Sequence, residues 1–398
     1  MESVSPGSSL RPLLADVGVI ALVADHWGKE WMSRHQILTR LARYFRVVWV
    51  NPSQDWHDAL NQPIHLHAET SEVAPGFHVY GPELWLPKFY RPRYLADLTF
   101  RKRLEHARNL LSSQGCKKII LYIWHPQFAD SLDAVQFDLS CYHIVDEYTF
   151  SDVDLPITDE EQKLLEQADQ VVVHTKALFE KKRASHRFVA LVPNGVAYSA
   201  FSTPGPEPEA LAGIPHPRIG YVGYLKKTLD WDILLQLTER HPEYSFVFVG
   251  AQKQEDEVLR ALQQLSRRPN VHLVGPLPSS DMAPYPQHFD VCIMPYKLND
   301  YTKYIYPLKL HEYLASGRPV IASPTPLLKE FEEVISLCRS VDQWSAAISK
   351  ALQPAANTAE AREARQEVAK KHDWDLLARR IARIFCERLN LCYKPLLS

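Results

Sequence analysis

The sequence predicts an α/β protein of two domains, each built on a parallel β-sheet. The chain has 398 residues, which is more than one ordinary hydrophobic core accommodates. Short apolar runs typical of buried strands alternate with amphipathic helical segments in both halves, the pattern of βαβ units. Between the halves, residues 199–217 contain five prolines and little periodicity, as expected of a linker. We therefore expect an N-terminal domain over residues 1–198 and a C-terminal domain over residues 218–373.

The composition indicates a globular protein with no general attraction to nucleic acid. Hydrophobic residues make up 46% of the chain, charged residues 23%, and the formal net charge is −2. Six cysteines without a Cys-x-x-Cys pair favour reduced thiols in the cytoplasm. Residues 1–15 lack the design of a signal peptide, and the apolar run at 17–24 is too short to cross a bilayer. We expect a cytoplasmic protein, either free or peripheral on the inner face of the membrane.

The first βαβ unit comprises a strand at 17–24, a helix at 33–44 and a strand at 47–50. Ligands of parallel sheets bind beyond the carboxyl ends of the strands. The loop at 25–34 follows the first strand and is a candidate for the acceptor side of a cleft, through Trp27, Gly28, Trp31 and Arg34. Simple packing of the two tryptophans within the loop explains the same residues equally well.

An aromatic and basic stretch occupies residues 85–118. Its helix has an apolar stripe flanked by cations, the stripe being Phe100, Leu104, Ala107 and Leu111 and the cations Arg101, Lys102, Arg103 and Arg108. Basic residues beside exposed aromatic side chains suit an anionic membrane surface. A stripe that faces the protein core, with a solvated basic flank, is the alternative.

Two further strands of the N-terminal half end in polar side chains. The strand at 119–124 runs into His125, and the strand at 141–145 into Asp146. α/β enzymes place active groups at this position, so His125 is a catalytic candidate and Asp146 an acceptor-side candidate. A plain loop histidine and a loop-capping carboxylate are the alternatives. Helices at 158–168 and 176–184, with strands at 171–174 and 188–192, complete this half, and Asn194-Gly195 predicts a turn with positive φ.

In the second half, three glycines follow strands on the expected ligand edge of the sheet. Strands at 218–223, 246–250, 271–274 and 291–294 alternate with helices at 231–240 and 255–265. Gly223, Gly250 and Gly275 end three of these strands, where the backbone can approach a diphosphate and a base closely. Lys226 or Lys227, in the turn after the first strand, would neutralise the diphosphate.

The stretch at 304–323 contains the largest group of candidate ligand-binding residues. It predicts a loop, a helix that begins at Pro307 and stops at Gly317, and a buried strand at 319–322. A helix N-terminus attracts phosphate, Lys309 adds a cation, and Glu312 would accept hydrogen bonds from a ribose diol. These features, together with the neighbouring Tyr304 and Leu308, suggest a site for a nucleotide sugar. An ordinary surface helix with an exposed Lys309–Glu312 ion pair is the alternative.

The run at 307–322 resembles the donor-binding segment of glycosyltransferase family 4 (glycosyl transferases group 1), whose members have the GT-B fold. The resemblance implies two Rossmann-like domains facing a cleft, with the last helix returning so that residues 374–398 complete the N-terminal domain. His125 is the closest match to a family histidine that faces the transferred sugar. The chain departs from the family at Tyr304, where many members carry the first of two glutamates, and Lys226 and Lys227 match the usual cationic pair only loosely.

The expected function is transfer of a sugar from a nucleotide-diphosphate sugar to an acceptor hydroxyl, with retention of configuration implied by the family. The catalytic candidates are His125, Lys309 and Glu312. The acceptor would be a glycan or lipid-linked, in glycan, polysaccharide or glycolipid synthesis. The alternatives are a catalytically silent nucleotide-sugar-binding protein, suggested by Tyr304, and a nucleotide-sugar epimerase.

We expect a metal-independent enzyme with no cofactor beyond its nucleotide-sugar substrate. Three Asp-x-Asp pairs, at 152–154, 230–232 and 373–375, are scattered along the chain and do not form one diphosphate loop. Cations and a helix N-terminus can instead neutralise the leaving diphosphate.

Overall fold

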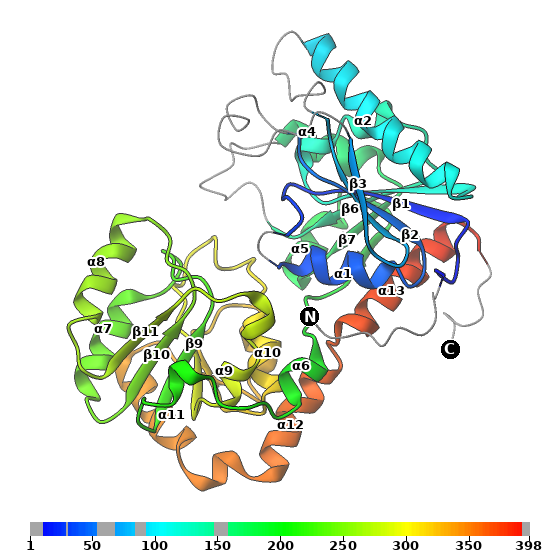
Figure 1. Ribbon diagram of the computed structural model, residues 1–398. Helices are drawn as coiled ribbons and strands as arrows, with labels where there is room; N and C mark the ends of the chain where they lie inside the picture. The colour runs from blue at the N-terminus through cyan, green and yellow to red at the C-terminus, as the bar shows by residue number, and fades with distance from the viewer. Residues whose placement is uncertain (1–10, 29–30, 54–67, 84–92, 147–157, 392–398) are drawn as a thin grey trace. The chain divides into compact units, whose positions relative to one another are not determined.

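The computed structural model describes residues 11–28, 31–53, 68–83, 93–146 and 158–391. The chain forms two compact units (Figure 1). One is residues 194–374, and the other joins the chain up to Pro193 with residues 375–398. Residues 199–217, expected as a linker, belong to the first of these units. There Arg218 donates hydrogen bonds to the carbonyls of Ile214 and Leu211 and pairs with Glu207.

The N-terminal unit is built on an eight-stranded sheet of order β3-β4-β2-β1-β5-β6-β7-β8. All neighbouring strands are parallel except β3 and β4. The strands are β1(Val17–Leu22), β2(Arg46–Val50), β3(Glu69–Ala74), β4(Phe77–Gly81), β5(Lys118–Ile123), β6(Leu139–Ile144), β7(Gln170–Val173) and β8(Val189–Leu191). The sequence did not predict the β3–β4 hairpin, because the edge strand β3 is polar and mostly exposed and lacks an apolar face.

The helices of this unit are α1(Ser33–Leu41), α2(Arg93–Ser113), α3(Ser131–Ala134), α4(Thr158–Gln167), α5(Lys176–Lys182) and α13(Trp374–Arg388). From Asp375 onward α13 packs on the N-terminal unit, beside α1 in Figure 1. Asp375 pairs with Arg40 and Arg43, and the Phe385 ring contacts Tyr122 edge-on at 5.1 Å between ring centroids. The end of the chain is therefore part of the first sheet's core.

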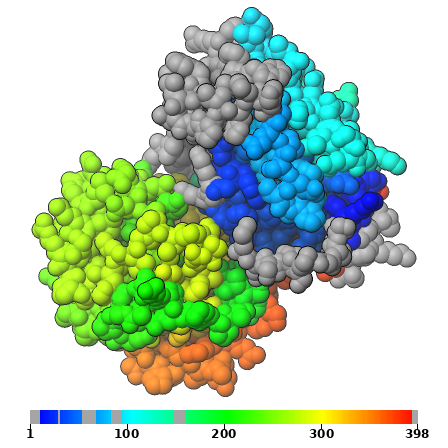
Figure 2. Space-filling model, viewed as in Figure 1, coloured from blue at the N-terminus to red at the C-terminus, as the bar shows by residue number. Residues whose placement is uncertain are grey.

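Helix α2 turns its apolar stripe inward. Leu104, Ala107 and Leu111 are fully buried, and a Cβ on Gly18 of β1 would lie only 2.8 Å from Leu111. Figure 2 shows α2, coloured cyan, at the surface of the unit. This packing is what the core-facing interpretation of the stripe predicts. Arg103 departs from the expected basic flank, because it is buried.

The C-terminal unit has a six-stranded, wholly parallel sheet of order β11-β10-β9-β12-β13-β14. The strands are β9(Arg218–Val222), β10(Ser245–Val249), β11(Val271–Gly275), β12(Val291–Met294), β13(Val320–Ala322) and β14(Ser336–Leu337). The helices are α6(Tyr198–Ser202), α7(Trp231–Arg240), α8(Asp256–Leu265), α9(Pro284–Gln287), α10(Lys309–Ala315), α11(Val341–Ala351) and α12(Ala359–Lys370). Helices α7, α8 and α11 cover one face of the sheet and α9, α10 and α12 the other (Figure 1).

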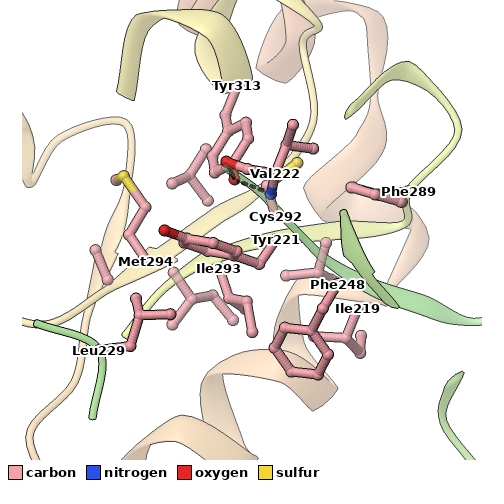
Figure 3. Packing of buried hydrophobic residues seen from close by; sticks show 14 of the residues in the cluster. Ile219, Tyr221, Val222, Leu229, Phe248, Phe289, Cys292, Ile293, Met294 and Tyr313 are labelled. Carbon is pink, nitrogen blue, oxygen red and sulfur yellow. Dashed lines mark hydrogen bonds between the residues drawn. The ribbon is translucent and has the colours of Figure 1, made fainter. Parts of the chain in front are cut away.

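The core of this unit fixes α10 against the end of β9. Leu310, Tyr313 and Leu314 of α10 are fully buried, and their i, i+3, i+4 spacing places them on one face of the helix. The Tyr313 hydroxyl accepts a hydrogen bond from the Val222 N–H at 2.8 Å (Figure 3). Because Val222 is the last residue of β9, this bond sets where α10 stands relative to the turn that follows the strand.

Candidate functional site

Three strand-end glycines of the C-terminal unit lie at one edge of the sheet. Gly223 donates a hydrogen bond to the Val249 carbonyl at 2.7 Å, and Gly250 donates to the Gly275 carbonyl at 2.8 Å. All three have positive φ, +134° at Gly223, +137° at Gly250 and +89° at Gly275. Residues other than glycine rarely adopt this backbone conformation. A Cβ on Gly250 would also overlap the Gly223 carbonyl group. This edge therefore presents bare backbone.

Lys309 lies directly on the first of these turns. A Cβ on Gly223 would overlap the Cε and Nζ atoms of Lys309, and the ammonium lies 5.2 Å from the centroid of the Tyr221 ring. The helix α10 begins at Lys309 and not at Pro307 as expected. Its first turn is nevertheless anchored on the Pro307 carbonyl, which accepts from the Leu310 N–H at 3.2 Å. The helix has only seven residues, so the positive charge at this turn is chiefly that of the Lys309 ammonium and not that of the helix dipole.

Glu312 lies one turn further along α10 and is half-buried. Burial raises the pKa of its carboxyl, and the nearby Lys309 lowers it. Burial also raises the pKa of the Tyr221 and Tyr296 hydroxyls, and the Glu312 carboxylate contributes in the same direction. The site thus combines a cation, a carboxylate and two neutral phenols beside bare backbone, a set suited to a diphosphate and a diol.

The other donor-side candidates surround this cluster. Pro307 is buried, and Leu308, Tyr304 and Lys226 are half-buried. The Lys303 ammonium lies 5.6 Å from the centroid of the Tyr304 ring. Lys227 is exposed, and its backbone N–H donates to the Glu255 carboxylate at 2.9 Å. The Lys309 ammonium lies against Gly223, and Lys226 and Lys227 belong to the turn that follows this glycine.

The helix carries a feature that the sequence did not single out. His311 is fully buried, and its Nε2 atom lies 2.8 Å from the Tyr306 hydroxyl. Its ring stacks on His372 with 3.9 Å between ring centroids, and burial holds the pKa of His311 well below its ordinary value. The neutral pair ties α10 to the end of α12. The Asn194 amide donates to the Tyr306 carbonyl at 3.1 Å, and Gly195 does not have the positive φ that was expected of an Asn-Gly turn.

In the N-terminal unit, His125 follows β5 and is half-buried. Its Nδ1 atom accepts a hydrogen bond from the Gln127 N–H at 3.2 Å and so caps the short helix η2(Pro126–Phe128). An Nδ1 acceptor leaves the proton of the neutral imidazole on Nε2.

The loop after β1 is organised by packing. The Trp27 and Trp31 rings lie 5.4 and 5.1 Å from the ring of His35, centroid to centroid, and the Trp27 N–H donates to Asn51 at 2.8 Å. Arg34 pairs with Asp25. Gly28 is exposed with φ +84°, and Asp146 is half-buried. The loop-packing alternative explains the two tryptophans, and Arg34 is engaged within the loop.

A cavity of about 340 Å³ lies elsewhere in this unit. The described residues that line it come from the segments after β1, β2 and β5 and from helix α2, and they are Ala24, Pro52, Ser53, Ala96, Asp97, Phe100, Arg103, Gln127, Phe128 and Asp130. The sequence analysis missed this cavity, because its walls come from segments up to a hundred residues apart. The available signal was that Ala24 ends one predicted strand and that Ser53 and Gln127 follow two others.

The scattered aspartates have local structural partners. Asp230 caps α7 by accepting from the Ile233 N–H at 3.1 Å, Asp373 accepts from the Tyr198 N–H, and Asp375 pairs with two arginines. The pair at 152–154 lies outside the described residues. Within the described ranges no group of three or more His, Cys, Asp or Glu side chains could hold a metal ion. In the same ranges, no helix combines the length and apolarity needed to span a membrane.

Comparison with known proteins gives three kinds of match. Residues 216–354 match the family described as glycosyl transferases group 1. A Bacillus subtilis (strain 168) protein named as a teichuronic acid biosynthesis glycosyltransferase, TuaH, is 26% identical over 92% of this chain and 96% of its own.

Solved structures share the fold at low identity. An E. coli structure described as trehalose-6-phosphate bound with UDP-2-fluoro glucose has a TM-score of 0.67 and 12% identity, covering 95% of this chain and 99% of its own. A trehalose-6-phosphate synthase studied for glycosyltransfer with retention has a TM-score of 0.64 and 12% identity, covering 94% and 99%. The chain has the GT-B fold of two Rossmann-like units and is a glycosyltransferase, and its residues 216–354 match the group 1 glycosyl transferases.

Proposed function

We propose that the enzyme transfers a sugar from a nucleoside-diphosphate sugar to an acceptor hydroxyl. The observation that carries this proposal is the contact between Lys309 and the Gly223 turn. A lysine ammonium over bare backbone, at the carboxyl edge of a parallel sheet, is an arrangement that binds phosphate groups. The E. coli structure with UDP-2-fluoro glucose, which has the same fold, supports a nucleotide sugar as the donor.

The roles at the donor site follow from the side-chain chemistry. Lys309, assisted by Lys226 or Lys227, neutralises the diphosphate as it leaves with the nucleotide. Glu312 accepts hydrogen bonds from the ribose diol, and the turns at Gly223, Gly250 and Gly275 allow the nucleotide to approach the backbone. These groups supply the charge stabilisation, so the proposal needs no metal ion.

His125 is the proposed catalytic group of the N-terminal unit. The Gln127 N–H donates to its Nδ1 atom and orients the ring, and the family resemblance implies that this histidine faces the transferred sugar. Retention of configuration is proposed from the family, and it is supported by the description of the trehalose-6-phosphate synthase as acting with retention.

We place the reaction in polysaccharide or glycolipid synthesis, supported by the naming of the Bacillus subtilis relative after teichuronic acid. A glycan or a lipid-linked glycan is then the acceptor, and an anionic membrane surface on the cytoplasmic side is a proposed partner. Tyr94 and Leu98 of α2 are 67% and 48% exposed, and Arg101 and Lys102 lie beside them. Sedimentation with phosphatidylglycerol vesicles that high salt reverses would support this contact, and equal binding to neutral vesicles would oppose it.

The deciding experiment is a panel of UDP-, GDP- and TDP-sugars incubated with the purified protein. We expect release of the nucleoside diphosphate from one class of donor, and a rate reduced by about 10²-fold or more in Lys309→Gln. Lys350→Gln, a change at an exposed lysine of α11, is the matched control and should be neutral. Tight nucleotide binding without any turnover would favour the silent binding protein that Tyr304 suggests.

A further inference from the structure

The cavity of the N-terminal unit stands at the edge of the sheet where ligands bind. Ala24 follows β1, Ser53 follows β2 and Gln127 follows β5, and all three residues line the cavity. These strands are adjacent and parallel, in the order β2-β1-β5. The carboxyl edge of such a sheet is where α/β proteins bind their ligands. A volume of about 340 Å³ is also within the range of small-molecule pockets, roughly 300–1,000 Å³.

The apolar part of the cavity is aromatic. Phe100 of α2 and Phe128 of η2 both line it, with ring centroids 6.5 Å apart and ring planes only 19° from parallel. Both side chains are half-buried, so part of each ring remains accessible. A pyranose presents a patch of C–H groups on its face. The face of a phenyl ring is negative and attracts such C–H groups. The aromatic panel therefore suits a sugar ring.

The polar part of the cavity consists of planar groups with paired hydrogen-bonding atoms. Asp97, Gln127 and Asp130 line it with exposed side chains, and Arg103 lines it with a buried one. Carboxylates accept two or more hydrogen bonds, and amides and guanidinium groups offer paired donors. Neighbouring hydroxyl groups on a sugar present donors and acceptors at matching spacing. The mixture of acceptors and donors fits a ligand that has both.

The cavity continues into a second one of about 230 Å³, with which it shares Asp97, Phe100 and Asp130. The described charged residues that line the two are balanced. Three are acidic (Asp97, Asp130 and Asp133) and three are basic (Arg101, Arg103 and Lys163). The Lys163 ammonium pairs with Asp130 and Asp133 at 2.8 Å each. A groove for a polyanion would carry an excess of cations, and the described residues that line this groove do not supply one.

We propose that the groove between α2 and the η2–α3 segment binds a neutral oligosaccharide, with one sugar ring against Phe100 and Phe128 and its hydroxyls on Asp97, Gln127 and Asp130. The two adjoining cavities, of about 340 and 230 Å³, suit more than one ring. If the protein is the proposed transferase, on which this assignment rests, the bound glycan is the acceptor. This places acceptor binding in the groove and not on the tryptophans of the loop at 25–34.

The test is binding of the full chain, without any donor, to an array of immobilised neutral di- to tetrasaccharides of glucose, galactose and N-acetylhexosamines. Glucuronic-acid-containing chains and sugar phosphates on the same array are the anionic counterparts. We expect binding to neutral chains that weakens about tenfold or more in Asp97→Asn and in Phe100→Leu, which lose a charged acceptor and an aromatic face.

Glu105→Gln is the matched control, because Glu105 is an exposed carboxylate of α2 that does not line either cavity. It should bind as the wild type does. Neutral-chain binding that both groove variants leave unchanged would overturn the proposal, as would binding confined to the anionic sugars or no binding to the array. Because the array needs no nucleotide, its failure is separate from a failure of the donor panel.

Discussion

The two predicted ligand edges differ in how the structure uses the polar residues found in the sequence. In the C-terminal unit, Lys309 and Glu312 stand at the sheet edge beside the Gly223 turn. In the N-terminal unit, the loop after β1 turns its tryptophans toward His35 and pairs Arg34 with Asp25. The difference shows that a glycine turn leaves backbone that a lysine and a ligand can both approach, whereas an aromatic loop fills its own space.

The largest expected effect distinguishes Gly223, at the proposed donor site, from Gly28, in the loop after β1. Gly223→Ala should reduce sugar transfer by at least about 10²-fold, because the new Cβ needs a rare φ and displaces the Lys309 ammonium. Gly28→Ala introduces the same atom at positive φ with no neighbour within 4 Å. It should lower the free energy of unfolding by about 1 kcal/mol without changing turnover. Equal losses of activity in the two variants would contradict the different roles assigned to Gly223 and Gly28.

A second prediction concerns the packed loop, where burial and then the charge of Arg34 lower the pKa of His35 to about 4. In the unfolded state His35 has a pKa near 6.5. Between pH 6.5 and 4 the unfolded state therefore binds a proton that the folded state does not bind. Stability should fall as the pH drops from 6.5 to about 4, by roughly 3 kcal/mol from this histidine. Urea unfolding of wild type and His35→Gln across that window measures it, and the variant should lose this part of the slope. Identical slopes would mean that His35 is not a packing residue of the loop.

The third prediction tests His125, the catalytic candidate of the N-terminal unit. His125→Ala should lower turnover by about 10²-fold, the lower range for a positioned catalytic group. Nucleotide affinity should stay nearly constant, because the proposed base, ribose and diphosphate contacts are in residues 223–312. A variant with normal turnover would remove His125 from the mechanism, and Asp146 would be the next candidate. Circular dichroism must show that the variant is folded.

The smallest of these effects is at Glu312. Glu312→Ala should weaken nucleotide binding by roughly 1.5–3 kcal/mol, the usual contribution of a hydrogen bond to a charged group. Calorimetry with the ribonucleotide and its 2′-deoxy analogue distinguishes the cause. The wild type should prefer the ribonucleotide and the variant should not, whereas a preference that survives the change would place the diol elsewhere.

What the sequence could predict follows the same division. The strand–turn–helix segments around Gly223 and Lys309 are contiguous or repeat a local pattern, so periodicity and glycine placement located them to within two residues. Six of the eight strands of the N-terminal sheet were predicted, and the polar edge strand β3 and its buried partner β4 were not. The cavity beneath α2 was not predicted, because Ala24, Ser53, Phe100 and Gln127 become neighbours only through the strand order. Nor does a helical pattern reveal that Arg103 is buried on the core side of α2.

The most direct measurement of the central claim is the preference of the protein for nucleoside diphosphates over monophosphates with the same base. If Lys309 holds the diphosphate over the Gly223 turn, calorimetry should show that the wild type binds the preferred diphosphate about tenfold or more tightly than its monophosphate. Lys309→Gln should abolish most of that ratio, and Lys350→Gln should preserve it. An unchanged ratio in Lys309→Gln would contradict the account, because the diphosphate would then be bound by other groups.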